Sequence, residues 1–555
     1  MAPGNALLNI SDSADESSWG SGAADRYAAL FAPLDHLLHA GGDERLALAG
    51  HTGLNIYGCK PAPRPEAICF SSSTASSISS RAYRRARDAQ LRLVEQAAVS
   101  GFLESFESHS ENMRGSVRRY FGLEGSEAEI VFSPSGTDAQ LHALLLSGLS
   151  LGFPLTSIIA GSDQTGSGTA YTAGARHFGS RTARGKSVLK GSHISGSPKE
   201  IHTVEIPFAD SDSTVRNGDE MDRLIFAAVS AEIGKGRKVL LQAMHASKLG
   251  WRAPSDECLA KIANTWPAAV QIVIDACQMR ISPSRIADYL SRGCLILFTG
   301  SKFFSGPPFS GGLLVPKHLS KKFEQAAEIP RGLFDYADRT DLPRSWANLR
   351  RELALEPNFG QWLRWEAAME EMRDYYALPI AYRKAVLAGL AEAVPKALRS
   401  SCRLEPLGSP PNGYSATERD EEFAAPTIFP FLMRDDKGLL DDKSVAEIYR
   451  ALNRNITCEI AFGATPDEIS LATQICHIGQ PVKVMLPGGG VTAALRIAIG
   501  SRNLFEAWSP AGAGRAIKII LVDVDTVIRK TDLILKNRDQ AAAPVTRNME
   551  TCNGL

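Results

Sequence analysis

Three short segments of the sequence place polar side chains directly after apolar runs, where an open sheet presents its functional groups. In the first segment, SPSGTDA (133–139), the polar residues lie between the apolar run EIVFS and a helical pattern. A helix N-terminus offers free backbone N–H groups, Gly136 lets an anion approach the backbone closely, and Thr137 adds a hydroxyl donor. The segment therefore predicts a phosphate cradle, although the same residues would also suit a simple helix N-cap.

The other two segments place an acid and an amine at the ends of two further apolar runs. Asp275 lies near the end of VQIVIDA (270–276), and Lys302 follows CLILFTG (294–300). A buried Asp is costly unless it has a partner, which a protonated pyridine nitrogen supplies. A Lys whose pKa is lowered can form a Schiff base. Taken singly, Asp275 would also suit a turn cap and Lys302 a surface position.

The order of these segments along the chain favours one cofactor. A phosphate cradle, then a strand-end Asp, then a strand-end Lys is the order in which a site for pyridoxal 5′-phosphate (PLP) is assembled. We therefore predict that Lys302 is catalytic and forms a Schiff base with PLP. Asp275 would keep the ring nitrogen protonated, so that the ring acts as an electron sink. The partner is then a small-molecule amino acid or amine substrate.

The elements that must position these residues are predicted by apolar runs that alternate with helical patterns after residue 127. Such runs are typical of strands buried on both faces. They predict an α/β fold, with a mostly parallel sheet and helices on both faces in a large domain, followed by a smaller C-terminal α+β domain. The runs are 129–133, 156–161, 202–208, 238–244, 270–276, 294–300 and 311–316.

Changes in composition divide the chain into five segments. They are a flexible tail (1–24), an N-terminal arm with helices (25–110), the large PLP-binding domain (111–375), the small domain (376–535) and a polar tail (536–555). Helices are expected over 25–39, over 79–107 with its arginines on a solvated face, and over 359–398 with a break at Pro379. Strands of the small domain are expected at 427–433, 457–462, 494–500 and 516–524.

The overall composition excludes several classes of function. The 555 residues contain 61 basic and 61 acidic side chains, so no excess charge points to nucleic acid or to a membrane surface. The nine cysteines are scattered without metal-ligand spacing, which predicts reduced thiols and no bound metal. The polar N-terminus and the lack of a long apolar run predict a cytoplasmic protein.

The three segments together resemble the fold-type I PLP-dependent enzymes, and among them the class V aminotransferase and cysteine desulfurase family, over roughly residues 100 to 505. The resemblance rests on SPSGTDA, DACQ (275–278), GSKFFSGPPFSGG (300–312) and LRIAIG (495–500). It implies that Ser135, Gly136 and Thr137 bind the phosphate and that Gln278 lies on the side of the ring hydroxyl. It also implies that Arg496 binds the substrate α-carboxylate.

The chain departs from the family pattern at several positions. Ser301 stands where the family has a His before the lysine, so one charged donor is lost. Gln164 is the candidate where the family stacks a His on the ring, and Ser247 loosely matches a residue that contacts the cofactor oxygen. Ser310 is expected to reach the phosphate of a neighbouring subunit, because such enzymes are homodimers with shared active sites.

Two residues of the arm leave alternatives open. Asn55 and Tyr57 would line the substrate pocket, or would only pack the arm.

One departure bears on the reaction. Some desulfurases carry His-Cys-x-Gln-Pro, whereas this chain has His477-Ile-Gly-Gln-Pro481 with Ile478 at the nucleophile position. Cys476 is interpreted as a small buried residue, so persulfide chemistry by this route is disfavoured. The predicted function is an aminotransferase-like transferase. The alternatives are a PLP-dependent lyase, by β-elimination, Cα–Cβ cleavage or decarboxylation, and a non-catalytic binding protein.

Overall fold

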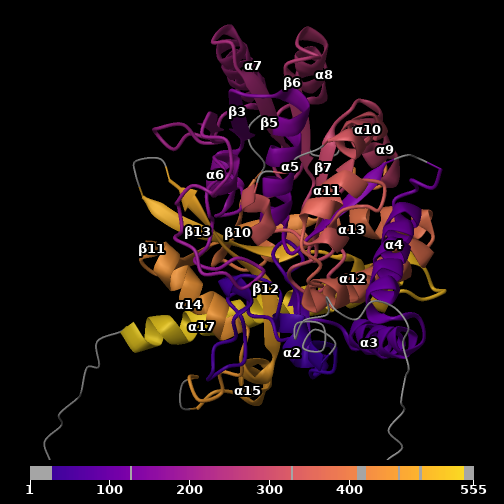
Figure 1. Cartoon of the computed structure of the whole chain (residues 1–555). Coiled ribbons are helices and arrows are strands. Elements are labelled where there is room, and N and C mark those ends of the chain that lie inside the picture. The colour runs from indigo at the N-terminus through magenta and orange to yellow at the C-terminus, as the bar shows by residue number, and fades with distance from the viewer. Residues whose placement is uncertain are drawn as a thin grey trace, which may run out of the picture.

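The computed structural model describes residues 28–125, 128–326, 329, 331–408, 420–460, 463–486 and 490–542. Its larger sheet has seven strands in the order β2-β8-β7-β6-β5-β3-β4 (Figure 1). Only β8 runs antiparallel to its neighbours. The strands are β2 (Glu129–Ser133), β3 (Leu155–Ala160), β4 (Ile201–Ile206), β5 (Lys238–Met244), β6 (Val270–Asp275), β7 (Leu295–Thr299) and β8 (Gly311–Val315). All seven predicted strands are therefore confirmed within one or two residues.

Helices cover both faces of this sheet, which confirms the predicted α/β architecture. Along β6, Ile272 and Ile274 pack into one apolar core and Val273 into another. The first core includes apolar residues of α7 (Gly218–Gly234), α8 (Asp256–Thr265), α9 (Pro283–Ser291) and α12 (Phe359–Ala377). The second includes residues of α5 (Gly136–Leu151), α10 (Lys317–Gln325) and α11 (Ala347–Glu352). Strands buried on both faces explain why their sequences are continuously apolar.

The smaller sheet is mixed and takes one strand from the N-terminal arm. Its order is β1-β12-β13-β10-β11, with β9 beside β10. The arm strand β1 runs parallel to β12, and this pairing joins two segments far apart in the sequence. The strands are β1 (Ala67–Phe70), β9 (Leu404–Pro406), β10 (Ile428–Asp435), β11 (Gly438–Leu439), β12 (Ile475–Met485) and β13 (Val491–Ala498).

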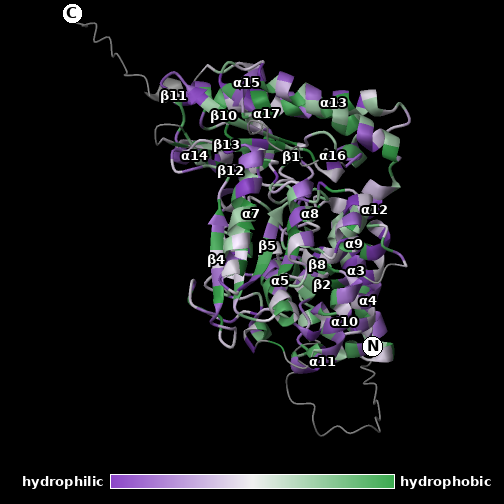
Figure 2. Ribbon diagram, turned by 90° about the horizontal axis from the view of Figure 1, so that it is seen from above, coloured by the Kyte–Doolittle hydropathy of each residue, from purple (hydrophilic) through white to green (hydrophobic). Residues whose placement is uncertain are grey.

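The remaining helices surround the two sheets. Helices α13 and α17 lie side by side along the smaller sheet (Figure 2). Among the described helices, none is both long and apolar enough to cross a membrane. The helices are α2 (Leu34–His39), α3 (Ser80–Ser100), α4 (Phe102–Tyr120), α6 (Thr169–Ala173), α13 (Ile380–Leu398), α14 (Asp442–Leu452), α15 (Pro466–Thr473), α16 (Ser501–Glu506) and α17 (Ala513–Ala542), with short 3-10 turns at Glu44–Leu46, Ser162–Gln164, Arg331–Asp335 and Arg339–Asp341.

Two predicted strands of the small domain are wrong. Residues 516–524 belong to helix α17, in which Ala516, Ile520 and Val524 are buried at helical spacing. The continuous apolar run looked like a strand because Ile519 and Val522, which are exposed, belong to the same run. Residues 457–460 form a turn, and 461–462 lie outside the described residues. The break at Pro379 is confirmed.

The predicted helices of the arm and the predicted start of the polar tail also need correction. The helix expected over 79–107 is two helices, α3 and α4, separated by Gly101 at a φ of 78°. Residues 28–30 are helical but separated from α2 at Pro33, while 25–27 lie outside the described part. The flexible tail 1–24 lies outside it too. Helix α17 extends to Ala542, so the polar tail begins later than residue 536.

The arginines of α3 are not simply a solvated face. Arg81 pairs with Glu371 and Asp374, and Arg85 pairs with Glu366, all on helix α12. These carboxylates are at most 9% exposed, and the α3 arginines share their neutralisation with Arg502, which also pairs with Glu371, and with Arg373, which also pairs with Asp374. The arm is thereby held against the large domain.

Candidate functional site

A cavity of about 280 Å³ lies between the carboxyl ends of the large-sheet strands and the smaller sheet. Eleven of the thirteen predicted site residues line it: Tyr57, Ser135, Gly136, Thr137, Gln164, Ser247, Asp275, Gln278, Ser301, Lys302 and Arg496. One acidic side chain and four basic ones are among its lining residues, the other bases being Arg45 and Lys248. The cavity is therefore suited to a ligand that carries several negative charges.

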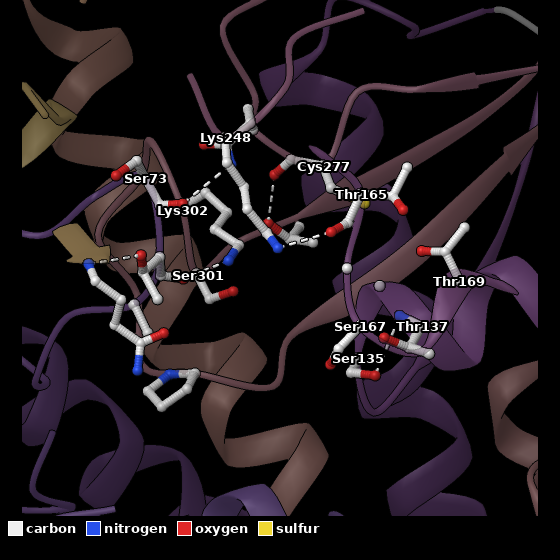
Figure 3. A pocket seen from close by; sticks show the side chains of 18 of the residues that line it. Ser73, Ser135, Thr137, Thr165, Ser167, Thr169, Lys248, Cys277, Ser301 and Lys302 are labelled. Carbon is white, nitrogen blue, oxygen red and sulfur yellow. Dashed lines mark hydrogen bonds between the residues drawn. The ribbon is translucent and has the colours of Figure 1, made fainter. Parts of the chain in front are cut away.

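The phosphate cradle is built where β2 turns into α5. Ser135 is the N-cap of α5 and accepts the N–H groups of Thr137 and Asp138. A Cβ atom at Gly136 would lie 2.9 Å from Cys277 Sγ, so only glycine lets these two turns approach. Hydroxyl groups of Ser135, Thr137, Ser167 and Thr169 gather at this end of the cavity (Figure 3).

Arg45 brings to this cradle a positive charge that the sequence did not indicate. Its guanidinium donates to Ser135 Oγ at 3.2 Å and to Thr137 Oγ1 at 3.3 Å. Asp43 binds the same guanidinium through both carboxylate oxygens and so orients it. Arg45 is separated from the cradle by about ninety residues of chain, so no local pattern could have revealed the contact. It supplies a cation in a site where Ser301 replaces the family's His.

The loop after β3 completes the cradle. This segment, residues 161–174, lines the cavity with Gln164 and Thr169. The hydroxyl of Thr169 is buried without a hydrogen-bond partner in the described structure. Gly168 lets the loop pass close to Thr137, because a Cβ atom there would lie 2.5 Å from that side chain. An unpartnered buried hydroxyl in a cavity indicates a missing acceptor or donor, such as a phosphate oxygen.

Asp275 presents an uncompensated carboxylate to the cavity. Its described hydrogen-bond partners are neutral: the backbone N–H of Cys277 at 3.1 Å and the amide of Gln140 at 3.5 Å. Burial raises the pKa of Asp275 above that of an ordinary carboxyl group. A cationic group placed in the cavity would reverse this effect and keep the carboxylate charged.

Lys302 faces the same cavity from the loop after β7. Two glycines bring this loop against helix α12, since a Cβ atom at Gly300 would lie 2.5 Å from Ala368 and one at Gly306 would lie 2.8 Å from the same side chain. The amine donates to the Thr74 carbonyl. Burial, together with the nearby charge of Arg496, lowers the pKa of Lys302 to about 7. Near neutral pH a large share of this amine is therefore uncharged and nucleophilic.

Arg496 lies on β13 at the opposite wall and is 1% exposed. Its guanidinium donates only to neutral oxygens in the described structure: the carbonyls of Gln480 and Lys248 and the hydroxyl of Thr74. Burial lowers the pKa of Arg496 to about 10. No acid is among its described partners, and the role that the resemblance implies for Arg496, binding of a substrate carboxylate, stays a prediction.

Lys248 is a second cavity amine that sequence reasoning missed. It follows β5 and donates to the Thr165 carbonyl at 2.7 Å. Burial and the charge of Arg496 lower the pKa of Lys248 to about 8. Its position just beyond the carboxyl end of a buried strand was the available signal. Figure 3 shows Lys248 and Lys302 facing the cavity.

Gln164 and Ser247 contact each other at the cavity wall. Ser247 donates to the amide oxygen of Gln164 and accepts the backbone N–H groups of Leu249 and Trp251. Gln278 donates to the Ser73 carbonyl at 3.0 Å. The Ser73 hydroxyl, which also lines the cavity, has no hydrogen-bond partner within the described structure. The roles predicted for Gln164, Ser247 and Gln278 stay predictions.

Two predicted site residues do not line the cavity. The amide oxygen of Asn55 accepts the N–H groups of Tyr57 and Cys59, so this side chain shapes the arm instead of contacting a ligand. Ser310 is 1% exposed in the single chain and packs near Gly300. Its predicted contact with the phosphate of a neighbouring subunit stays a prediction. The homodimer itself stays a prediction.

The residues around the cavity fit PLP at three points. The hydroxyl groups, the helix N-terminus and Arg45 suit its phosphate, and the unpartnered Thr169 hydroxyl is left for an oxygen. Asp275 suits a protonated ring nitrogen because it has no charged hydrogen-bond partner of its own. Lys302 has the lowered pKa that attachment to an aldehyde requires.

No protein-family model and no curated protein matches the chain. Among solved structures, the cysteine desulfurase CsdA (S-sulfonic acid) from Escherichia coli is 13% identical and covers 86% of this chain and 95% of that chain, with a TM-score of 0.47. Oryza sativa TDC with PLP and tryptamine is 13% identical, with 87% and 85% covered and a TM-score of 0.46. Mouse CSAD in apo form is 14% identical, with 84% and 85% covered and a TM-score of 0.46. Likeness at this level carries no inference about activity.

The contact of Arg45 with the cradle leads to a prediction about cofactor affinity. Replacing Arg45 by methionine is expected to weaken PLP binding by about 10- to 100-fold, the loss of one charge-assisted hydrogen bond. Binding of pyridoxal, which lacks the phosphate, should change little. Both affinities can be measured by absorbance titration, with Arg184→Met as the control because Arg184 bonds to Ala337 outside the cavity. If Arg45→Met weakened the binding of PLP and of pyridoxal equally, the predicted contact of Arg45 with the phosphate would be contradicted.

Proposed function

We propose that the chain is a PLP-dependent enzyme of fold type I that acts on an amino acid with aminotransferase-like chemistry. The observation that supports it is the arrangement of Lys302, Asp275 and Arg496 around one cavity. Each of these groups has only neutral hydrogen-bond partners in the described structure. Buried charges without partners are costly, so a ligand that completes them is expected.

Each residue then has a distinct part in the reaction. PLP, when bound, supplies an electron-withdrawing ring that stabilises negative charge at the substrate Cα. Arg496 binds the substrate carboxylate and thereby orients the Cα bonds. Asp275 holds a negative charge beside the ring nitrogen. Lys302, whose pKa is close to neutral, both attaches the cofactor and carries a proton at Nζ as general base and acid.

A lyase is the second candidate, and Lys248 is the observation that favours it. Elimination of a substituent from Cβ requires a proton donor for the leaving group, and Lys248 is a further cavity amine with a pKa of about 8. Persulfide transfer through the His477–Pro481 segment is not proposed. Ile478 and Cys476 are fully buried, neither lines the cavity, and burial raises the pKa of Cys476 to about 11.

The proposal is tested by adding PLP to the purified chain and following absorbance at about 410–430 nm, the range expected for a PLP–lysine adduct. Amino acids are then supplied with and without an α-keto acid acceptor, and products are identified by mass spectrometry. Turnover that requires the acceptor supports transamination, and turnover without it supports the lyase. A chain that stays colourless with PLP would exclude both candidates.

A further inference from the structure

A second cavity, of about 600 Å³, lies between the arm and the smaller sheet and shares no lining residue with the Lys302 site. Cys69 and His477 both line it. They are register partners on the parallel strands β1 and β12, so their side chains lie on the same face of the sheet. Cys69 is partly exposed, whereas Cys59 and Cys476 beside it in the fold are buried. A thiol and an imidazole therefore lie side by side in an accessible cavity.

The hydrogen bonds of His477 determine which of its nitrogens can accept a proton. Nε2 lies 2.8 Å from the Tyr57 carbonyl oxygen, which can only accept, so Nε2 carries the hydrogen. Nδ1 is then the basic nitrogen and is free to take the proton of the Cys69 thiol. A carbonyl thus orients the base, and the base lies beside the nucleophile on the paired strand, which is the arrangement of activated cysteines.

Other groups around Cys69 favour its thiolate form. Its sulfur lies 3.2 Å from Ser71 Oγ, which can donate to a thiolate, and in the thiol form it donates to Ser76 Oγ at 3.6 Å. Burial would raise the pKa of Cys69, but His477, Arg502 and Ser71 outweigh it and lower the pKa to about 6. Burial raises the pKa of the neighbouring thiol Cys59 and of Tyr449, so these groups stay neutral near pH 7.

The charge of the cavity indicates what kind of molecule would enter. Four arginines line it: Arg64, Arg81, Arg84 and Arg502. Its acids are Glu66, Glu506 and Asp523. Arg64 pairs with Glu66, and Arg81 and Arg502 pair with Glu371, so Arg84 is the lining guanidinium for which the described structure shows no acidic partner. A small anionic reagent would be attracted to Arg84 more than a neutral one.

We propose that Cys69, activated by His477, is a nucleophilic thiol that undergoes exchange with small anionic disulfides in this second cavity. The Cys69 proton passes to His477 Nδ1, and the thiolate attacks one sulfur of the disulfide. A new bond forms between Sγ and that sulfur as the original S–S bond breaks, and the leaving thiolate takes the proton from His477. Oxidation of Cys69 is balanced by reduction of the disulfide. A free thiol reverses the reaction.

The test uses the full chain with Cys402, Cys458 and Cys552 replaced by serine. The first two are exposed and would react as background, and the third lies outside the described residues. The probes are 5,5′-dithiobis(2-nitrobenzoate), which is anionic, and neutral 2,2′-dithiodipyridine. Burial raises the pKa of Cys277, the other partly exposed thiol, so this group stays protonated near neutral pH. One thiol per chain should therefore react at that pH, peptide mapping should place it at Cys69, and the rate should have a pH midpoint near 6.

Two variants separate activation from charge attraction. His477→Gln should move the midpoint toward about 8.5, the value of an ordinary thiol, while His202→Gln on β4 should leave it unchanged. Arg84→Gln should slow the anionic probe more than the neutral one. The pH midpoint is also measured on the parent chain, in which His477 is unchanged. That measurement does not depend on whether the His477→Gln variant folds. A midpoint near 8.5 in the parent, or label at another cysteine, would overturn the proposal.

Discussion

Replacing Lys302 by alanine is expected to abolish covalent capture of PLP and to lower turnover by about 10³-fold or more. The amine is both the point of attachment and the proton carrier, so its loss removes two contributions at once. Absorbance after PLP addition and borohydride trapping measure the first effect, and steady-state turnover measures the second. Peptide mass mapping of the trapped protein should place the label on Lys302.

The cavity offers a matched control for this variant. Lys248 lies in the same cavity and also has a lowered pKa, yet it follows β5 instead of the β7 loop. Lys248→Met should keep the trapped cofactor and its colour. If Lys248→Met lost the cofactor while Lys302→Ala kept it, the attachment site would be misassigned.

The same prediction has a pH dependence whose sign follows from the pKa of Lys302. Only the uncharged amine attacks an aldehyde, and its pKa is lowered from 10.5 to about 7. The rate of PLP capture should therefore rise about tenfold per pH unit below pH 7 and level off above about pH 8. Stopped-flow absorbance measures this rate. A rate that kept rising to pH 10 would show that the burial seen around Lys302 does not lower its pKa.

Replacing Asp275 by asparagine is expected to lower kcat by about 10²- to 10³-fold while the cofactor stays bound. The asparagine oxygen can still accept the Cys277 N–H, so the local turn should persist. What is lost is the negative charge beside the ring nitrogen, and removing one partner of a buried ion pair costs about 3–5 kcal/mol. The measurement is kcat at saturating substrate, with absorbance to show that PLP is retained.

Gln140→Leu is the control for Asp275→Asn. Gln140 donates to Asp275 at 3.5 Å but carries no charge, so its loss should change kcat by less than about tenfold. An Asp275→Asn enzyme with unchanged kcat would show that ring protonation does not depend on this residue. Loss of cofactor in that variant would instead assign Asp275 a binding role.

The parts of the site that the sequence determined are those next to strand ends. Asp275 ends a strongly apolar strand and Ser135 and Lys302 each follow one, and the carboxyl ends of parallel strands meet at one edge. That these three residues lie close together could therefore be predicted from their positions at strand ends. The fold class was predictable for the same reason, because strands buried on both faces have a distinct sequence pattern.

Only the tertiary structure decided the contributions that come from distant segments. Arg45 reaches the cradle from the arm, and β1 pairs with β12 across about four hundred residues, which is what places Cys69 beside His477. Helix α17 was misjudged because an apolar run in a long helix has the same local pattern as a strand. For Asn55 the sequence left two roles open, because a polar residue that shapes an arm looks like one that lines a pocket. The local sequence pattern shows which face of each segment is apolar and therefore buried. It does not show which distant segments contact one another, because those contacts are set by the tertiary structure.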